Sequence, residues 1–288
     1  MNEKSLNKED IESIVQLALI EDSAFNDLTT KHLISDEHQE KFSLIANETG
    51  IISGLDLFQE TMRQSSEKIK TNGAKKDGDI VHSGEIIFEL IGPINKILSA
   101  ERVSLNFLQM LSGISSLTYQ FIQKINSKQT IIRDTRKTRP LLRKLEKYAV
   151  TKGGGQNHRN TLDDFVLIKD NHLNWAKKNG MQITAIIQKY KEEIGKNCIV
   201  EIEVESIADA EEALRAQADI ILLDNMHIDE IKKICKAKAK AKAKAKIEIS
   251  GGINIKNIDQ YADLNIDYIA IGALIHSAKF FDLSLEIN

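Results

Sequence analysis

The N-terminal part of the chain mixes helical and strand spacing of its apolar positions. Apolar residues recur at helical spacing in three segments, 11–20, 55–69 and 98–111. Two short apolar runs, 42–46 and 85–91, are bounded by turn residues and predict strands. We expect the third helix to end at Gly113, because glycine commonly follows the last turn of a helix.

From Ile131 onward the pattern changes to short apolar strands, most of them separated by helical segments. Strands are predicted at 131–132, 165–168, 199–204, 220–223, 247–249 and 268–271. Helical spacing fills the gaps at 207–216, 228–235 and 255–264. Such alternation is typical of a parallel sheet, either open or closed into a barrel. In these folds the chemistry lies where the strands end, at their C-terminal side.

Each of these strands ends in polar or small residues. In chain order, the strand ends are 133–137, 169–172, 201–205, 224–225, 250–252 and 272–273. One such ending would mean little, but a set of them within one domain predicts an active site at the mouth of a barrel.

Composition limits the classes of protein to which the chain can belong. Of its 288 residues, 42% are hydrophobic and 28% are charged, which excludes a disordered chain. No apolar run is long enough for a membrane span, and residues 1–4 lead into an amphipathic stretch unlike a signal peptide. Cys198 and Cys235 are too few for a disulfide scaffold and lack metal-ligand spacing. We expect a cytoplasmic protein with reduced thiols and no membrane partner.

The charge is unevenly distributed. The net charge of −3 does not favour nucleic acid as a partner. Between Ile131 and His172, however, ten Lys and Arg residues stand against five Asp and Glu residues. This segment predicts a site for a small anion, although a solvated basic face would give the same count.

Three carboxylates alternate with apolar residues in one predicted strand. Glu201, Glu203 and Glu205 should point to the same face, which in a barrel is the interior. Buried carboxylates need a cation partner, which Lys169, nearby arginines or a divalent metal could supply. The alternative is an exposed edge strand with one polar face.

Glycine loops and basic residues provide candidates for anion binding. Ser250-Gly251-Gly252 and Gly272-Ala273 follow two successive late strands, where glycine lets backbone N–H groups approach a phosphate, although each could be an ordinary turn. The basic candidates are Arg136, Lys137, Arg159 and Lys169. His158 is as compatible with a structural hydrogen bond as with a ligand contact. The alternating Lys–Ala run at 236–246 is interpreted as a solvated helix end or loop rather than an anion tether.

Taken together, these motifs resemble the quinolinate phosphoribosyltransferase family, also called carboxylating nicotinate-nucleotide pyrophosphorylases. The resemblance covers nearly the whole chain. The matching motifs are 18–22, 101–106, 134–138, 147–150, 153–155, 157–159, 167–172, 201–205, 223–226, 250–253 and 276–278.

The resemblance implies an α/β fold in two parts. An N-terminal α/β open sandwich, residues 1–113, is joined by the C-terminal segment 276–288. An incomplete α/β barrel of the seven-stranded type, residues 114–275, carries the site. The resemblance also implies a homodimer, or a hexamer of such dimers, in which Arg102 is donated to the neighbouring subunit's barrel.

The implied reaction joins quinolinate to phosphoribosyl pyrophosphate in the presence of Mg²⁺. Its products are nicotinate mononucleotide, pyrophosphate and CO2, in de novo NAD biosynthesis. Lys169, Glu203 and Asp224 are the implied catalytic residues, and Glu203 and Asp224 also bind the ribose hydroxyls and the metal. The full set of implied substrate-binding residues is Arg102, Thr135, Arg136, Lys137, His158, Arg159, Lys169, Glu203, Asp224, Ser250, Gly251, Gly252, Ile271, Gly272 and Ala273.

The chain departs from the family pattern around its loop proline. Arg139 and Leu141 stand where the family usually has Thr and Gly. Leucine at a glycine position predicts a negative φ there, and Arg139 could contact phosphate. Two alternatives to the implied function are a molybdate-transport-associated homologue with a different substrate, and a non-catalytic phosphate-binding barrel. Quinolinate is favoured over the molybdate-associated substrate by the presence of Arg102, Arg159 and Lys169. The non-catalytic alternative is disfavoured by Glu203 and Asp224, because phosphate binding alone does not need carboxylates.

Overall fold

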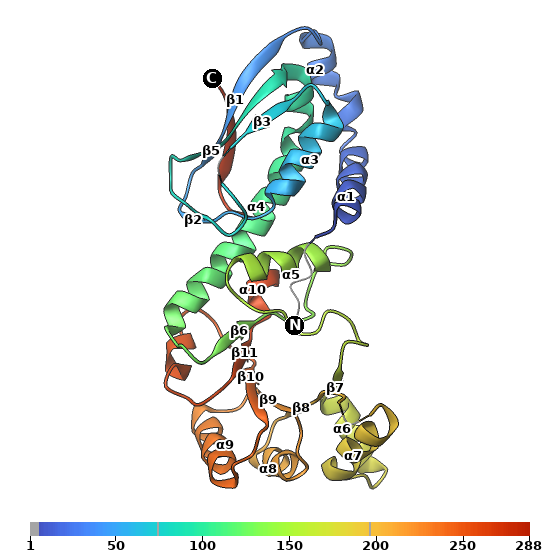
Figure 1. The fold of residues 1–288 in the computed structure, drawn as a ribbon, viewed down its shortest axis with the longest axis vertical. Helices are drawn as coiled ribbons and strands as arrows, with labels where there is room; N and C mark the ends of the chain where they lie inside the picture. Colours follow the sequence, from blue (N-terminus) through green and yellow to red (C-terminus); the bar gives the residue numbers. More distant parts are fainter. Residues whose placement is uncertain (1–5, 74, 196) are drawn as a thin grey trace. The chain divides into compact units, whose positions relative to one another are not determined.

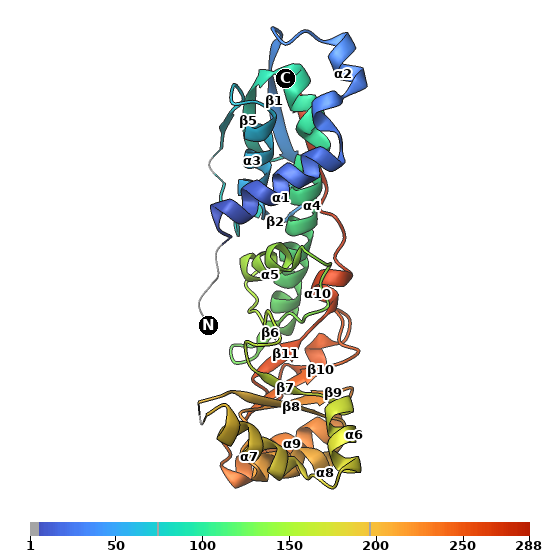
Figure 2. The ribbon, with the colours of Figure 1, turned by 90° about the vertical axis from the view of Figure 1, so that its right-hand side faces the viewer.

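The computed structural model describes residues 6–73, 75–195 and 197–288. The chain divides into two compact units (Figures 1 and 2). The sandwich unit comprises residues up to 119, 138–154 and 274–288, and the barrel unit comprises 120–137 and 155–273. The domain limits expected at residues 113 and 275 remain predictions.

The sandwich unit is built on a four-stranded antiparallel sheet. Its strand order is β12 (Leu283–Ile287), β1 (Gln39–Ala46), β5 (Ile86–Pro93) and β3 (Lys70–Asn72). In β1, Phe42 and Leu44 share one face and are both buried. β12 pairs with β1, so the C-terminal segment of the chain belongs to this sheet. The remaining elements are α1 (Lys8–Glu21), η1 (Ala24–Asn26), α2 (Leu28–Leu33), β2 (Gly50–Ile51), α3 (Leu55–Ser65), β4 (Ile80–Val81) and α5 (Arg143–Lys152).

The predicted helix end at Gly113 is wrong. Helix α4 runs from Ile94 to Ile125 without interruption. Gly113 instead permits a close chain crossing, because a Cβ at this position would overlap the backbone carbonyl oxygen of Lys279. Glycine is therefore needed at this position for a contact with a segment distant in sequence. Rules for helix ends consider only neighbouring residues and do not include such a contact.

The barrel unit contains a six-stranded parallel sheet in the order β6, β11, β10, β9, β8, β7. Its strands are β6 (Ile131–Arg133), β7 (Val166–Ile168), β8 (Val200–Val204), β9 (Ile220–Asp224), β10 (Lys246–Ser250) and β11 (Tyr268–Ala270). On the free side of β6, Gln156 forms a single parallel bridge with Arg133. The seventh position of the expected barrel is thus occupied by one bridging residue rather than by a strand.

Helices follow the barrel strands, as the alternation predicted. They are α6 (Asp170–Lys178), α7 (Ile183–Glu193), α8 (Ile207–Arg215), α9 (Ile228–Ala241) and the short α10 (Ala273–His276). The helix expected over 255–264 is wrong, because only a 3-10 turn, η2 (Ile258–Tyr261), forms there. The side chains of Asn254 and Asn257 both donate to the carbonyl oxygen of Gly252, which holds the preceding segment as a loop. No helix in the described parts of the chain combines the length and apolar character of a membrane span.

The Lys–Ala run begins as the last turns of a helix. Helix α9 continues to Ala241 and ends at Lys242, whose φ of 51° is left-handed, and β10 begins at Lys246. Lys238 and Lys246 both pair with Asp267, at Nζ–Oδ distances of 2.9 and 2.6 Å. The helix-end interpretation is confirmed, and two of the lysines stabilise the junction between helix and strand.

The expected negative φ at Leu141 is also wrong. Its φ is 67°, and its side chain is 95% exposed. The backbone N–H of Leu142 donates to the carbonyl oxygen of Arg139, which closes a turn with Pro140 at its second position and Leu141 at its third. With positive φ at its third residue this is a type II turn, in which proline is common at the second position and glycine is favoured at the third. Neighbouring Arg139 pairs with buried Glu146 at 2.5 Å.

Replacement of Leu141 by glycine is therefore expected to stabilise the protein. Left-handed backbone costs an L-residue about 1–2 kcal/mol, while glycine adds about 0.5–1 kcal/mol of unfolded-chain entropy, so a net gain of about 1 kcal/mol is expected. Urea unfolding of both proteins measures the difference. Leu141→Ala keeps the Cβ and should change the free energy of unfolding by less than about 0.5 kcal/mol. An equal gain in both variants would show that the exposed side chain, and not the backbone, is the cause.

Candidate active site

The predicted strand-end residues of the barrel unit lie at one edge of the sheet. All of its strand pairs are parallel, so their carboxyl ends share that edge. Asp224 pairs in register with Ser250, and Glu203 pairs with Leu222, which places Glu203 and Asp224 on the same face of neighbouring strands. Lys169 directly follows β7. The strand β8 lies between β7 and β9, so the exposed edge-strand interpretation is wrong.

Glu203 and Asp224 form the negative part of the site. Lys169 Nζ lies 3.8 Å from Glu203 Oε2. Burial raises the pKa of Glu203, the charge of Asp224 raises it further, and Lys169 opposes both effects. Asp224 accepts hydrogen bonds from Ser250 Oγ at 2.5 Å and Asn225 Nδ2 at 2.8 Å. The two carboxylates are thus close enough to repel one another and are held in place by neighbouring side chains.

This pair of carboxylates fits a divalent cation. Their mutual repulsion, expressed in the raised pKa of Glu203, would be relieved by a positive ion between them. Mg²⁺ prefers oxygen ligands and commonly takes only one or two carboxylates, with water and substrate phosphates completing its shell. Glu203 and Asp224 are the residues that would hold it.

The glycine loop after β10 has the backbone geometry that the sequence suggested. Gly251 and Gly252 have φ values of 89° and 64°, which disfavour other residues. A Cβ on Gly251 would also overlap the side chain of Asn225, whereas nothing lies within 4 Å of the corresponding position on Gly252. Gly252 therefore faces open space, as a phosphate-binding loop requires. After β11, Ile271 is buried, and Gly272 leads to Ala273, the first residue of α10.

Besides Lys169, the site contains two neighbouring cations, Arg136 and Arg159. Arg159 is only 6% exposed, and its Nη1 donates to the carbonyl oxygen of Phe165 at 3.4 Å. Burial lowers the pKa of Arg159, and the charge of Arg136 lowers it further, while Glu201 opposes both. The Nε atoms of both arginines are buried without a hydrogen-bond partner in the described structure. Two neighbouring guanidinium groups with unused donors suit a ligand with more than one carboxylate.

Thr135 and Lys137 lie next to these arginines in the chain. The backbone N–H of Lys137 donates to Thr135 Oγ1 at 3.0 Å, and the Lys137 side chain is exposed. Arg102 is exposed on α4 in the sandwich unit. Its expected donation to a neighbouring subunit remains a prediction. Glu205 was expected to point inward, but β8 ends at Val204 and Glu205 is exposed.

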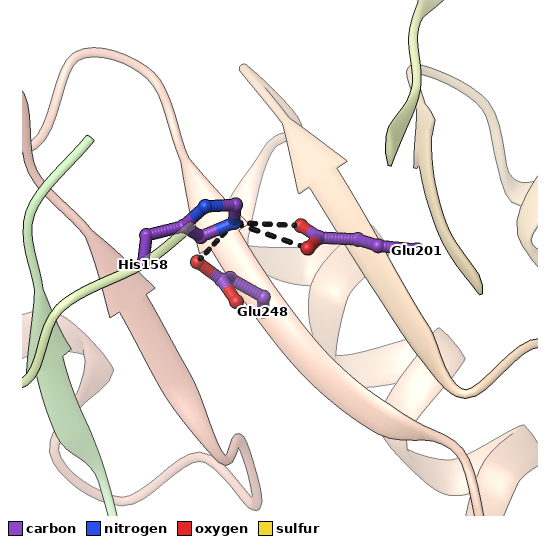
Figure 3. Close-up of side chains that lie close together, drawn as sticks. All are labelled: His158, Glu201 and Glu248. Carbon is purple, nitrogen blue, oxygen red and sulfur yellow. Dashed lines mark hydrogen bonds and ion pairs between the residues drawn. The ribbon is translucent and has the colours of Figure 1, made fainter. Parts of the chain in front are cut away.

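A buried ionisable cluster lies deeper in the barrel unit (Figure 3). His158 Nε2 is 3.0 Å from Glu201 Oε2 and 3.8 Å from Glu248 Oε1. Burial raises the pKa of each glutamate to about 7, and the charge of Glu201 contributes to the shift at Glu248. Arg133 Nη1 lies 2.9 Å from Glu248 Oε2. The charges of Arg133, Arg159 and Lys169 all favour ionised Glu201, as expected of its lysine and arginine partners, while its nearest partner is His158.

The sequence did not single out Glu248, and it placed Arg133 only within the polar strand end 133–137. Glu248 stands between two isoleucines in β10, and all three side chains are buried. A lone acid at an inward position of an otherwise apolar strand is a usable signal, because such a residue requires a buried partner. Arg133 lies at the end of β6, where its guanidinium stacks 3.2 Å above the ring centroid of Tyr268.

Comparison with known proteins assigns the chain to a family. The model of the quinolinate phosphoribosyl transferase N-terminal domain matches residues 27–112, and the model of the C-terminal domain matches residues 114–286. The chain belongs to the quinolinate phosphoribosyltransferase family. It is 36% identical to a probable carboxylating nicotinate-nucleotide pyrophosphorylase of Bacillus subtilis, with 98% of this chain and 95% of the relative covered. A protein of the same description from Methanocaldococcus jannaschii is 38% identical, with 95% and 96% covered.

Solved structures of this family share the fold. NadC from Streptococcus pyogenes aligns with a TM-score of 0.91 at 38% identity over 99% of each chain. The nicotinate-nucleotide pyrophosphorylase from Francisella tularensis aligns with a TM-score of 0.90 at 34% identity, covering 100% of this chain and 99% of that one. The predicted family and the predicted α/β fold are confirmed. The comparisons support the phosphoribosyltransferase function and give no support to either alternative.

Proposed function

We propose that this member of the quinolinate phosphoribosyltransferase family is a carboxylating nicotinate-nucleotide pyrophosphorylase. It transfers the phosphoribosyl group of phosphoribosyl pyrophosphate to quinolinate and releases pyrophosphate and CO2. The observation that carries the proposal is that one barrel unit holds both the neighbouring guanidinium groups of half-buried Arg136 and buried Arg159 and the neighbouring carboxylates of Glu203 and Asp224. Both substrates are polyanions, and the reaction develops positive charge, so the site needs both signs.

The basic residues bind quinolinate. Arg136 and Arg159 carry unused Nε donors for its two adjacent carboxylates, and Lys169 supplies a third positive charge. Binding in this way holds the ring nitrogen in one orientation for attack on the ribose. Positioning of this kind can supply a large part of the rate acceleration.

The carboxylates act on the ribose. As the bond from C1 of the ribose to pyrophosphate breaks, its electron pair leaves with pyrophosphate and positive charge grows on the ring. Glu203 and Asp224 stabilise this charge and bind the ribose hydroxyls, and Mg²⁺ bound beside them would neutralise the leaving pyrophosphate. Ser250, Gly251 and Gly252 present the phosphate-binding loop.

Decarboxylation then follows from the chemistry of the product. After the ring nitrogen bonds to C1 of the ribose, the ring is a cationic pyridinium. The bond to the adjacent carboxylate breaks, CO2 leaves, its bonding electrons enter the ring, and a proton is taken up at that carbon. The cations of the site hold the other carboxylate during this step, so that the protein mainly positions the ring and screens charge.

The direct test is product formation by the purified protein. Incubation with quinolinate, phosphoribosyl pyrophosphate and Mg²⁺ should yield nicotinate mononucleotide, pyrophosphate and CO2 in equal amounts. Quinolinate labelled at the carboxylate next to the nitrogen makes CO2 release measurable separately. Nucleotide formation without CO2, or no product, would contradict the proposal.

Assembly and location form a second part of the proposal. The protein forms a homodimer, or a hexamer of dimers, in which exposed Arg102 on α4 enters the partner's site. A cation at this position would add to Arg136 and Arg159, which bind the dicarboxylate. The reaction takes place in the cytoplasm.

Mixing of inactive variants tests the shared site. Arg102→Ala and Lys169→Ala subunits should each be inactive alone, because each lacks one cation of every site. A mixed dimer would contain one intact site of its two, and free exchange of equal amounts makes half of the dimers mixed, so about a quarter of normal activity should return. Subunit exchange is verified by mass spectrometry of differently tagged chains. Confirmed exchange without recovery would show that Arg102 serves its own subunit or none.

A further inference from the structure

The buried cluster beneath the site has no role in the mechanism above. We propose that Glu201 and Glu248 act through His158 as positioning residues that hold Arg159 in the geometry that binds quinolinate. The proposal rests on the proposed function, since it concerns how the same site recognises its dicarboxylate. It also assigns His158 a place behind the binding surface, rather than on it as the family resemblance suggested.

The hydrogen bonds of His158 fix its ring. Its Nδ1 accepts the backbone N–H of Arg159 at 2.8 Å, so the ring proton lies on Nε2. That nitrogen faces Glu201 at 3.0 Å and Glu248 at 3.8 Å (Figure 3). The backbone N–H of His158 donates to buried Asp134 at 2.9 Å. Both ring nitrogens therefore face protein groups, and the ring sets the position of the Arg159 backbone.

The glutamates are themselves held by rigid elements. Glu201 lies in β8 and Glu248 in β10, on the two sides of β9. Glu248 pairs with Arg133 of β6 at 2.9 Å, and Arg133 stacks on Tyr268 of β11. Two strands therefore supply the carboxylates beside the imidazole, and two more hold Glu248 through Arg133 and Tyr268. A side chain held by strands is placed more accurately than one held by loops.

The charge of Glu201 offsets the burial of Arg159. Burial and the neighbouring charge of Arg136 both disfavour the charged guanidinium of Arg159. Among the groups that favour the charged form, Glu201 has the largest effect. A buried cation without a nearby carboxylate would be costly to keep in place before the substrate arrives. Glu201 thus supports Arg159 in two ways, through its charge and through the imidazole.

A metal site is the competing interpretation of this cluster. His158, Glu201 and Glu248 offer ligand atoms that all lie within 4.8 Å of one another, and all three residues are buried. However, Glu248 already binds the guanidinium of Arg133, and the charge of Arg159 also acts on Glu201. Two arginines beside the cluster oppose an additional cation, so a positioning network accounts for the charges better.

Isothermal titration of quinolinate and of phosphoribosyl pyrophosphate, each into separately purified variants, tests this network. Glu248→Gln and Glu201→Gln keep the shape of each side chain but remove its charge. Each should weaken quinolinate binding by about 10–100-fold, the usual effect of losing a residue that orients a ligand-binding group. Phosphoribosyl pyrophosphate should bind within about threefold of the unmodified protein, because its loop and carboxylates are unchanged. Glu205→Gln, an exposed neighbour of the same strand, is the matched control and should bind both normally.

The possible results separate the network from the proposed function. Failure of the unmodified protein to bind quinolinate would refute the proposed function itself. Normal quinolinate binding by both folded Gln variants would refute only the network. Equal weakening of both substrates would indicate a merely structural role and would also refute it. If one variant does not fold, as judged by thermal melting, the other provides the same comparison. A stoichiometric divalent metal in the purified protein, lost in both variants, would establish the metal site instead.

Discussion

Glu203→Gln is expected to lower kcat by at least about 100-fold while changing the KM for quinolinate by less than about threefold. The carboxylate of Glu203 lies beside Asp224, and in the proposed mechanism the two face the positive charge that grows on the ribose. An interaction made mainly in the transition state raises kcat without tightening substrate binding. Loss of a single preorganised electrostatic group typically costs about 10²–10³-fold. Asp224→Asn should behave in the same way.

Steady-state kinetics at several Mg²⁺ concentrations measures the effect. Both variants should need more Mg²⁺ for half-maximal activity, because each removes one ligand of the proposed ion. Glu205→Gln lies two residues beyond Glu203 and is exposed, so its rate should match that of the unmodified protein. Full activity without added Mg²⁺ in both site variants would remove Glu203 and Asp224 from the mechanism.

The barrel unit was largely predictable because its strands are local features. Runs such as 220–223 are apolar at every position, which is typical of strands buried on both faces, and β9 matches that run closely. Parallel pairing then requires the polar residues that follow each strand to share one edge. Lys169, Glu203, Asp224 and Ser250 could therefore be grouped before any coordinates were known.

Some of the errors arise where contacts between distant segments override local rules. Gly113 resembles a helix end, but its role is to let the chain near Lys279 cross α4. In the same way, nothing local connects Glu248 to His158, which lies 90 residues earlier in the chain and meets it only after the sheet has formed. The error at Leu141 is local: negative φ was expected because the residue is not glycine, whereas it is the third residue of a type II turn, which takes positive φ.

The charges of the site fall into two groups, and this arrangement predicts which pyridine acid it should prefer. Arg136 and Arg159 have unused Nε donors, while buried Glu201 offsets the charge of Arg159 and buried Glu248 pairs with Arg133. A site of this kind offsets part of its buried positive charge, yet it retains donors that suit the carboxylates of an anionic ligand. Those unused donors set the penalty for the wrong substrate.

Nicotinate should therefore be rejected in favour of quinolinate by about 10⁴-fold in kcat/KM. Nicotinate has one carboxylate where quinolinate has two, so one buried guanidinium would keep its donors unpaired. A site built to pair a polar group discriminates against an analogue lacking that group by about 10⁴–10⁵-fold. Removal of one arginine should reduce this selectivity. Nicotinate then no longer leaves that guanidinium unpaired, while quinolinate loses a partner for one of its carboxylates. Arg159→Ala is expected to weaken quinolinate binding about 100-fold, with a much smaller change for nicotinate.

Competition assays with both pyridine acids, supported by isothermal titration, would measure these ratios. Arg215→Ala is the matched control, because Arg215 is an exposed arginine at the end of α8 and should leave both affinities unchanged. Phosphoribosyl pyrophosphate should bind Arg159→Ala nearly normally, since its proposed contacts are Glu203, Asp224 and the loop after β10. Equal affinity for nicotinate and quinolinate in the unmodified protein would mean that the unused donors of Arg136 and Arg159 do not serve a dicarboxylate, and that the pocket recognises a different anion.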